Sequence, residues 1–243
     1  AGGVGGYFGA RLARAGEDVT FVARGAHLAA MQRDGLRVRS AVDGEWTVPV
    51  VAVAELDDVA PADLVLLCVK SYDTEAALDL AAPVVAAHTG ILSLQNGVDN
   101  ADAIVRRFGA GHAMGGVAYV FADLAGPGVV AHHQLGRILL GEMAGAPSVR
   151  AAAFAERCRA AGIAAEVEPE IRRALWQKYV FLTALAGTSA ATRLPAGALR
   201  RVPETRALWR RQVDELLALA TAAAVGLDPG TADAAERLLD GLA

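Results

Sequence analysis

Short apolar runs alternate with helical patterns along the first two thirds of this 243-residue chain, and no other feature constrains the fold as strongly. The clearest run is DLVLLCVK at residues 63–70, which is continuously apolar between polar ends, as expected of a strand buried on both faces. A second run at residues 19–24 is rich in β-branched and aromatic residues, and ILSLQ at residues 91–95 is a third. Strands that alternate with helices of ordinary length form a mostly parallel sheet with helices on both faces. The sequence therefore predicts a doubly wound α/β sheet.

The remaining elements of this part of the chain continue the series. Helices are expected up to Ala15, where Gly16 ends the pattern, and over residues 26–33, 74–87, 100–108 and from Pro147 to about 161. Short strands are expected at residues 36–39 and 46–53, around an Asp43-Gly44 turn. Further strands are expected at residues 113–121, 129–132, 137–141 and 163–167.

Beyond Pro169 the pattern is helical only. Helices are predicted over residues 171–191, 204–225 and 231–242. We therefore place a domain boundary near residue 168, between an α/β domain at 1–168 and an all-helical domain at 169–243. The helical domain is expected to take part in substrate binding, and its apolar helices are compatible with a homodimer.

Composition and charge exclude several classes of protein. Hydrophobic residues make up 54% and charged residues 21%, unlike a disordered chain. The net charge of −4 gives no electrostatic reason to expect nucleic acid or an anionic membrane as a partner. The longest uncharged stretch, residues 80–98, contains Pro83 and His88 and is typical of a helix end, a turn and a buried strand. We expect a soluble, cytoplasmic protein without a metal site, in which Cys68 and Cys158 are free thiols.

The chain begins with a glycine-rich loop that leads into a helix. A dinucleotide-binding fold needs a strand, then G-x-G-x-x-G, then a helix whose amino end faces the pyrophosphate. Gly2 and Gly5 fit the second and third glycines, with Gly3 and Val4 between them, in a Rossmann-type fold. The first glycine and the first strand would precede Ala1 and are missing from this sequence, which has no initiator Met. We expect the chain to be a piece of a longer protein, and to fold or bind NADPH poorly as written.

The end of the next predicted strand indicates which dinucleotide is bound. NAD sites usually carry an acidic residue about 20 positions after the glycine loop, which accepts a hydrogen bond from the ribose 2′-hydroxyl. This chain has Arg24 there and no carboxylate nearby. A guanidinium can pair with a 2′-phosphate through its planar donors, although an arginine at a strand end can also simply be solvated. The sequence favours NADPH.

Three polar side chains are candidates for the chemistry. Of 23 basic residues only Lys70 and Lys178 are lysines, and lysine, unlike arginine, can release a proton at working pH. Lys70 terminates the predicted strand at residues 63–70 and Asn96 terminates the ILSLQ strand, at the carboxyl ends where ligands of doubly wound sheets bind. Asn96-Gly97 is equally an ordinary turn, and Lys178 on an apolar helix can be a snorkelling surface residue.

Taken together, these segments resemble the ketopantoate reductase (2-dehydropantoate 2-reductase) family. The matching segments, in family order over nearly all of the chain, are GGVGGYFGARLARAG, FVAR, CVK, LQNGV, the GxVxH-type segment from Gly128 to His132, and LWQK. The resemblance implies a Rossmann domain, a helical domain and an active site between them. It also implies the reduction of 2-dehydropantoate to pantoate, a step of pantothenate biosynthesis, with NADPH as the reductant.

The resemblance assigns roles to the candidate residues. It implies that Lys178 is the catalytic acid, which protonates the substrate oxygen and also binds substrate. Lys70 and Asn96 would contact cofactor and substrate, the segment from Gly2 to Gly5 would contact the pyrophosphate, and Arg24 the 2′-phosphate.

The chain departs from the family on the substrate side. Leu182, Ala186 and Ala196 stand where the family has asparagines, and the first two share a helix face with Lys178. Sites that hydrogen-bond a hydroxyl and a carboxylate discriminate strongly through such amides, so 2-dehydropantoate is in doubt as the substrate. Arg193 is a hypothetical carboxylate anchor in their place. Two alternatives stay open: a reductase of a more apolar keto compound, and a non-catalytic homologue that binds NADPH.

Overall fold

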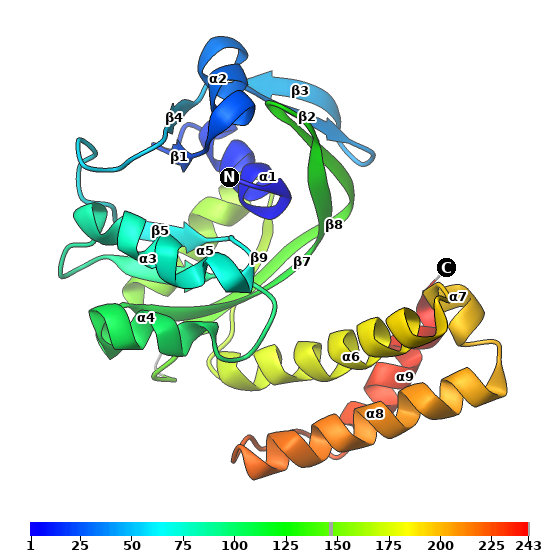
Figure 1. The fold of residues 1–243 in the computed structure, drawn as a ribbon. Coiled ribbons are helices and arrows are strands. Elements are labelled where there is room, and N and C mark those ends of the chain that lie inside the picture. The colour runs from blue at the N-terminus through cyan, green and yellow to red at the C-terminus, as the bar shows by residue number, and fades with distance from the viewer. Residues whose placement is uncertain (146–147, 243) are drawn as a thin grey trace. The chain divides into compact units, whose positions relative to one another are not determined.

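The computed structural model describes residues 1–145 and 148–242. Contacts divide the chain into two compact units, Ala1–Ile171 and Arg172–Ala243. The first unit is α/β and the second is helical (Figure 1).

The first unit is built on a seven-stranded sheet. Its strands follow the order β3-β2-β8-β7-β6-β5, and β9 pairs with β8 beside this path. The strands are β2 (Leu36–Ser40), β3 (Gly44–Val48), β5 (Leu64–Leu67), β6 (Gly90–Ser93), β7 (Ala113–Gly126), β8 (Val129–Glu142) and β9 (Ala164–Val167). Parallel pairs join β5 to β6, β6 to β7, β2 to β8 and β8 to β9.

The sheet is mixed: four of its six strand pairs are parallel, as expected, and two are antiparallel, which the sequence did not predict. β2 pairs antiparallel with β3, and β7 pairs antiparallel with β8 in a long hairpin (Figure 1). The strands expected at residues 129–132 and 137–141 are one strand, β8. Leu135 and Gly136, both at positive φ, form an irregularity within β8 where the register to β7 shifts, and this local kink resembled a strand break in the sequence.

A second, two-stranded sheet pairs β1 (Thr20–Val22) parallel with β4 (Val51–Val53). The single strand expected at residues 46–53 is therefore two strands, β3 and β4, in different sheets. Pro49 lies between them, and a proline has no N–H with which to continue a strand ladder. The Asp43-Gly44 turn is confirmed, since Gly44 has φ +75° where the β2–β3 hairpin reverses.

The helices of the first unit lie close to their predicted ranges. They are α1 (Gly3–Arg14), α2 (Gly25–Asp34), α3 (Thr74–Ala81), α4 (Asn100–Phe108) and α5 (Val149–Ala160). α3 ends earlier than predicted, and a short 3-10 turn that contains Pro83 follows it. The predicted helix start at Pro147 lies outside the described residues.

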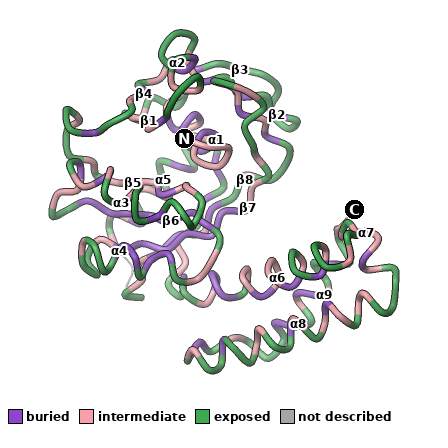
Figure 2. The backbone as a smooth tube through the Cα atoms, in the orientation of Figure 1, coloured by how far each residue is buried: buried purple, intermediate pink, exposed green. Residues whose placement is uncertain are grey.

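Helices cover both faces of the sheet, as the alternation of strands and helices predicted. On β6, Ile91 packs in a cluster with Leu78 of α3 and Ile104 of α4, whereas the adjacent Leu92 packs in a cluster with Phe8 of α1 and residues of α5. Every residue of β6 is buried (Figure 2). Its uncharged, mostly apolar sequence is the result, because both faces of the strand are covered.

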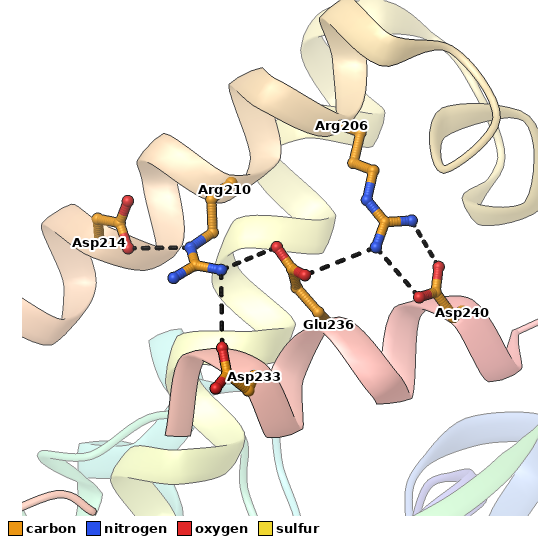
Figure 3. Close-up of polar contacts among 6 residues, drawn as sticks. All are labelled: Arg206, Arg210, Asp214, Asp233, Glu236 and Asp240. Atoms are coloured by element: carbon orange, nitrogen blue, oxygen red, sulfur yellow. Dashed lines mark hydrogen bonds and ion pairs between the residues drawn. The ribbon is translucent and has the colours of Figure 1, made fainter. Parts of the chain in front are cut away.

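The second unit consists of α6 (Ile171–Thr192), α7 (Ala196–Leu199), α8 (Pro203–Ala222) and α9 (Thr231–Gly241). The short helix α7 was not predicted. Trp209, Val180 and Leu239 are fully buried in a core shared by α6, α8 and α9. Arginines of α8 face acids of α9 (Figure 3). Arg210 bonds Glu236 at 2.8 Å and Arg206 bonds Asp240 at 2.6 Å.

Candidate functional site

The carboxyl ends of β5 and β6 place two of the candidate residues at equivalent positions. Leu67 of β5 pairs with Ser93 of β6, and each is the last residue of its strand. Lys70 follows Leu67 by three residues, and Asn96 follows Ser93 by three. Both strands end earlier than predicted, so Lys70 and Asn96 lie in the loops beyond the sheet rather than at strand termini. Both residues are exposed at the edge where doubly wound sheets bind ligands.

Local hydrogen bonds shape these two loops. The Lys70 carbonyl accepts the Asp73 amide at 2.9 Å, at the start of a 3-10 turn over Ser71–Asp73. The Asn96 carbonyl accepts Nδ2 of Asn100 at 3.1 Å, and Gly97 has φ +121°, a conformation that a side chain rarely adopts. The Asn96-Gly97 sequence therefore forms a turn, as this dipeptide commonly does, and Asn96 is exposed in this turn.

The start of α1 offers free backbone donors. Gly2 is its N-cap without a side-chain cap, and the first intrahelical bond runs from the Gly6 amide to the Gly2 carbonyl at 2.7 Å. The amides of Gly3, Val4 and Gly5 therefore have no acceptor within the helix. A Cβ added at Gly2 would have no atom within 4 Å. This open helix start suits an anionic ligand.

The other glycines of the loop serve packing. A Cβ on Gly5 would lie 3.0 Å from the Cβ of Cys68, so Gly5 lets α1 approach the end of β5, as predicted. A Cβ on Gly3 would lie 2.3 Å from the carbonyl oxygen of Ala122 on β7, a clash that the sequence did not predict. Gly2 alone among these three is open to a ligand.

Arg24 lies next to this loop. It is the N-cap of α2, two residues beyond the end of β1, and its exposed side chain forms no ion pair with any residue that the structure describes. The nitrogen of Ala1 donates a hydrogen bond to the carbonyl oxygen of Val22, which brings the glycine loop beside the end of β1. The free donors of α1 and the Arg24 guanidinium therefore share one edge of the first unit. This arrangement fits a dinucleotide with a phosphate on its ribose.

Lys178 lies on α6 in the second unit. Its side chain is partly buried, and this burial lowers the pKa of the Lys178 ammonium group to about 8. Leu182 and Ala186 follow one and two turns later on the same face of α6. Leu182 is partly buried and Ala186 is exposed. An amine with this pKa can hold or release a proton near neutral pH.

Arg193 and Ala196 lie beyond the end of α6. Arg193 is exposed and has φ +57°, a left-handed conformation that is common for the residue after a helix. Ala196 is the first residue of α7.

Gln95 is a residue whose importance the sequence interpretation missed. Its buried amide bonds the segment before Lys70 and the start of α3. The signal in the sequence was a single amide at the end of an otherwise apolar run, immediately before Asn96.

In residues 1–145 and 148–242, no group of three or more histidine, cysteine or acidic side chains could hold a metal ion. Within the same ranges, none of the helices has the length and hydropathy needed to cross a membrane.

Comparison with known proteins matches both parts of the chain to one family. Residues 1–145 match "Ketopantoate reductase PanE/ApbA", and residues 170–242 match "Ketopantoate reductase PanE/ApbA C terminal". The 2-dehydropantoate 2-reductase of Mesorhizobium japonicum is 35% identical over 241 residues, which cover 90% of this chain and 73% of that protein.

Solved structures agree. A PanE/ApbA family ketopantoate reductase from Ralstonia eutropha JMP134 has a TM-score of 0.89 and 38% identity, over 100% of this chain and 79% of that one. A D-mandelate dehydrogenase, solved with NADH and anilino(oxo)acetate, has a TM-score of 0.87 at 22% identity over 99% of this chain and 78% of that one, which is a similarity of fold. The chain belongs to the ketopantoate reductase family and is an oxidoreductase of that family.

Proposed function

We propose that this protein reduces a small 2-oxo acid with NADPH and that Lys178 is the general acid. The default substrate is 2-dehydropantoate, which would be reduced to pantoate, because the curated relative at 35% identity carries that name. The observation that carries the proposal is the partly buried amine of Lys178, whose pKa burial lowers to about 8.

The cofactor would be held by the first unit. The amides at the start of α1, in the segment from Gly2 to Gly5, would bind the pyrophosphate, and Arg24 would pair with the 2′-phosphate. NADPH supplies the hydride that the reduction needs. Lys70 and Asn96, beyond β5 and β6, would orient cofactor and substrate.

Lys178 would act on the substrate oxygen. The carbonyl oxygen gains negative charge as its carbon is reduced, and a protonated amine beside it stabilises that charge. The Nζ proton then passes to this oxygen, which becomes the product hydroxyl. A pKa of about 8 keeps the amine mostly protonated at neutral pH and still allows transfer.

The substrate side favours a second candidate, a more apolar 2-oxo acid. Leu182 and Ala186 present hydrocarbon on the face of α6 that carries Lys178. An apolar wall suits a hydrophobic or aromatic substituent better than the hydroxyl of 2-dehydropantoate. Arg193 would bind the carboxylate in either case, so Arg193→Ala should raise the KM for the oxo acid and leave the Kd of NADPH unchanged.

The test is NADPH oxidation by the full-length protein on a panel of 2-oxo acids. The panel contains 2-dehydropantoate, a branched aliphatic acid and an aromatic acid, and Lys178→Ala is the control. Turnover that Lys178→Ala reduces about 100-fold or more supports the proposal, and the preferred acid separates the two candidates. NADPH binding without turnover of any acid would show a non-catalytic homologue.

A further inference from the structure

The side-chain amide of Gln95 joins three segments at the carboxyl edge of the sheet. Its Nε2 donates to the carbonyl oxygen of Val69 at 3.0 Å and to Oγ1 of Thr74 at 2.8 Å. Its Oε1 accepts the hydroxyl of Ser93 at 3.0 Å. Gln95 is only 6% exposed, so these contacts replace the water that an amide would otherwise bind.

The positions of the three partners give this cluster its significance. Val69 immediately precedes Lys70, and Gln95 itself immediately precedes Asn96. A hydrogen bond to the Val69 carbonyl fixes the plane of the peptide from which Lys70 continues. Thr74 is the first residue of α3, which follows the Lys70 turn. One amide therefore holds both ends of the Lys70 loop against the residue that precedes Asn96.

Glutamine suits this position better than its closest substitutes. The Val69 carbonyl can only accept, so the site needs a donor there, and a second donor to Thr74 on the same nitrogen. A carboxylate would turn an acceptor towards the Val69 oxygen. A methionine of similar shape would leave the Val69 carbonyl and the Thr74 and Ser93 hydroxyls without this partner in a buried place.

We propose that Gln95 is a positioning residue that sets the placement of Lys70 relative to Asn96, and through it the binding of cofactor and oxo acid. This inference rests on the proposed function of Lys70 and Asn96. Gln95 itself touches neither reactant; it acts through the two loops.

The experiment is a double-mutant cycle between Gln95→Met and Lys70→Ala in the full-length protein, with Gln32→Met, at an exposed glutamine, as the control. Gln32 also donates an amide bond to a backbone carbonyl, that of Ala52 at 2.9 Å, but it joins α2 to β4. We expect Gln95→Met to lower kcat/KM about 10-fold to 100-fold, because small misplacements of orienting groups are costly. In the Lys70→Ala background the same substitution should cost less than about 2-fold, because residues that act through one another are not additive.

The outcomes separate positioning from a merely structural role. Equal losses in both backgrounds, or no loss beyond that of Gln32→Met, would overturn the inference. If Gln95→Met does not fold, Thr74→Val removes one bond of the same amide and enters the same cycle. If Lys178→Ala keeps full turnover, the proposed function fails, and the Kd of NADPH still decides about Gln95: a rise of about 10-fold supports the inference and an unchanged Kd rejects it.

Discussion

The imidazole ring of His132 lies against the phenol ring of Tyr7, with ring centroids 4.0 Å apart and planes 21° from parallel. Tyr7 belongs to α1 and His132 to β8, and His132 is 1% exposed. Its Nδ1 lies 2.8 Å from Oγ of Ser40, and its Nε2 lies 2.8 Å from the carbonyl oxygen of Leu135. Because that carbonyl can only accept, Nε2 is the donor and Nδ1 accepts the Ser40 hydroxyl. The histidine of the GxVxH-type segment thus ties α1, β2 and the β8 irregularity together.

Replacing His132 should destabilise the first unit. His132→Leu removes the donor to the Leu135 carbonyl and the acceptor of the Ser40 hydroxyl proton, although Ser40 keeps the bonds from the Val42 and Asp43 amides, at a cost of about 1–3 kcal/mol in the free energy of unfolding. The neighbouring His133 is the matched control, because its side chain is 59% exposed. His133→Leu should change stability by less than about 0.5 kcal/mol. Urea denaturation measures both, and equal losses would contradict the structural role of His132.

The stability of the protein should respond in opposite ways to substitution of Gly9, within α1, and of Gly2, the N-cap of α1. A Cβ on Gly9 would lie 2.6 Å from the ring of Phe21, which is only 4% exposed and has little room to move. Gly9→Ala should therefore lower the free energy of unfolding by about 1–2 kcal/mol, despite the helix preference of alanine.

Gly2→Ser should keep or slightly raise stability, because serine is a good N-cap. The new hydroxyl would compete for the free amides, so the Kd of NADPH should rise about 10-fold or more. Thermal melts and NADPH fluorescence titration measure these effects, and unchanged NADPH affinity in Gly2→Ser would count against a pyrophosphate site there.

The sequence alone predicted some of these features and not others. The run at residues 91–95 predicted a buried strand correctly, because burial on both faces leaves a local apolar signal, whereas the run at residues 63–70, the clearest candidate for a central strand, is the partly buried end strand β5. The strand β8 was predicted as two strands because Leu135 and Gly136 interrupt it with a kink. The partners of His132 and Gln95 were also out of reach, since Ser40 is 92 residues from His132 and Val69 is 26 residues from Gln95. The roles of Lys178 and Arg24 came from resemblance and spacing, and they stay predictions.

Arg24 should discriminate between the two nicotinamide cofactors. A charge-assisted hydrogen bond to the 2′-phosphate is worth about 1.5–3 kcal/mol, so Arg24→Ala should raise the Kd of NADPH about 10-fold to 100-fold. NADH lacks that phosphate, and its Kd should change less than about 3-fold. Arg33→Ala is the control, since Arg33 is an exposed arginine of the same helix that pairs with Asp34. A loss of the same size for both cofactors would remove Arg24 from the 2′-phosphate site.

The α8–α9 ion pairs should contribute modestly and depend on salt. Glu236 accepts from Arg210 at 2.8 Å and lies 3.6 Å from Arg206, so it bridges two arginines (Figure 3). Its side chain is 31% exposed, so Glu236→Gln should lower the free energy of unfolding by about 0.5–1 kcal/mol at low salt. The loss should be smaller in about 1 M NaCl, because salt at this concentration screens exposed charges. Among residues 1–145 and 148–242, Asp214 pairs with Arg210 of its own helix alone, and Asp214→Asn should cost less than about 0.5 kcal/mol. Thermal melts at two salt concentrations distinguish these cases, and a salt-independent loss in Glu236→Gln would point to packing instead.

The burial of the Lys178 side chain should lower the stability of the folded protein, and the same burial should support activity. Burial lowers its pKa from 10.5 to about 8, so between pH 8 and 10.5 the unfolded chain binds more protons than the folded one, and stability rises with pH across this window. Below about pH 8 the folded protein carries a buried charge at a cost. Lys178→Met should therefore raise the thermal midpoint at pH 7, and the gain should shrink as pH approaches 10.5. Lys70→Met, at an exposed lysine, should leave the midpoint unchanged.

Activity should depend on the same ammonium group, but it should fall with rising pH where stability rises. A general acid works only while protonated, so kcat/KM should fall as pH rises through about 8. Lys178→Met should lose about 100-fold or more in turnover and, with it, this pH dependence, even though the protein is more stable. The prediction fails if Lys178→Met has a lower thermal midpoint than the parent at pH 7 and its activity still falls near pH 8. The loss of stability and the pH dependence of activity would then come from another residue. A gain in stability that accompanies the loss of turnover is expected only if the buried ammonium group is retained for the reaction.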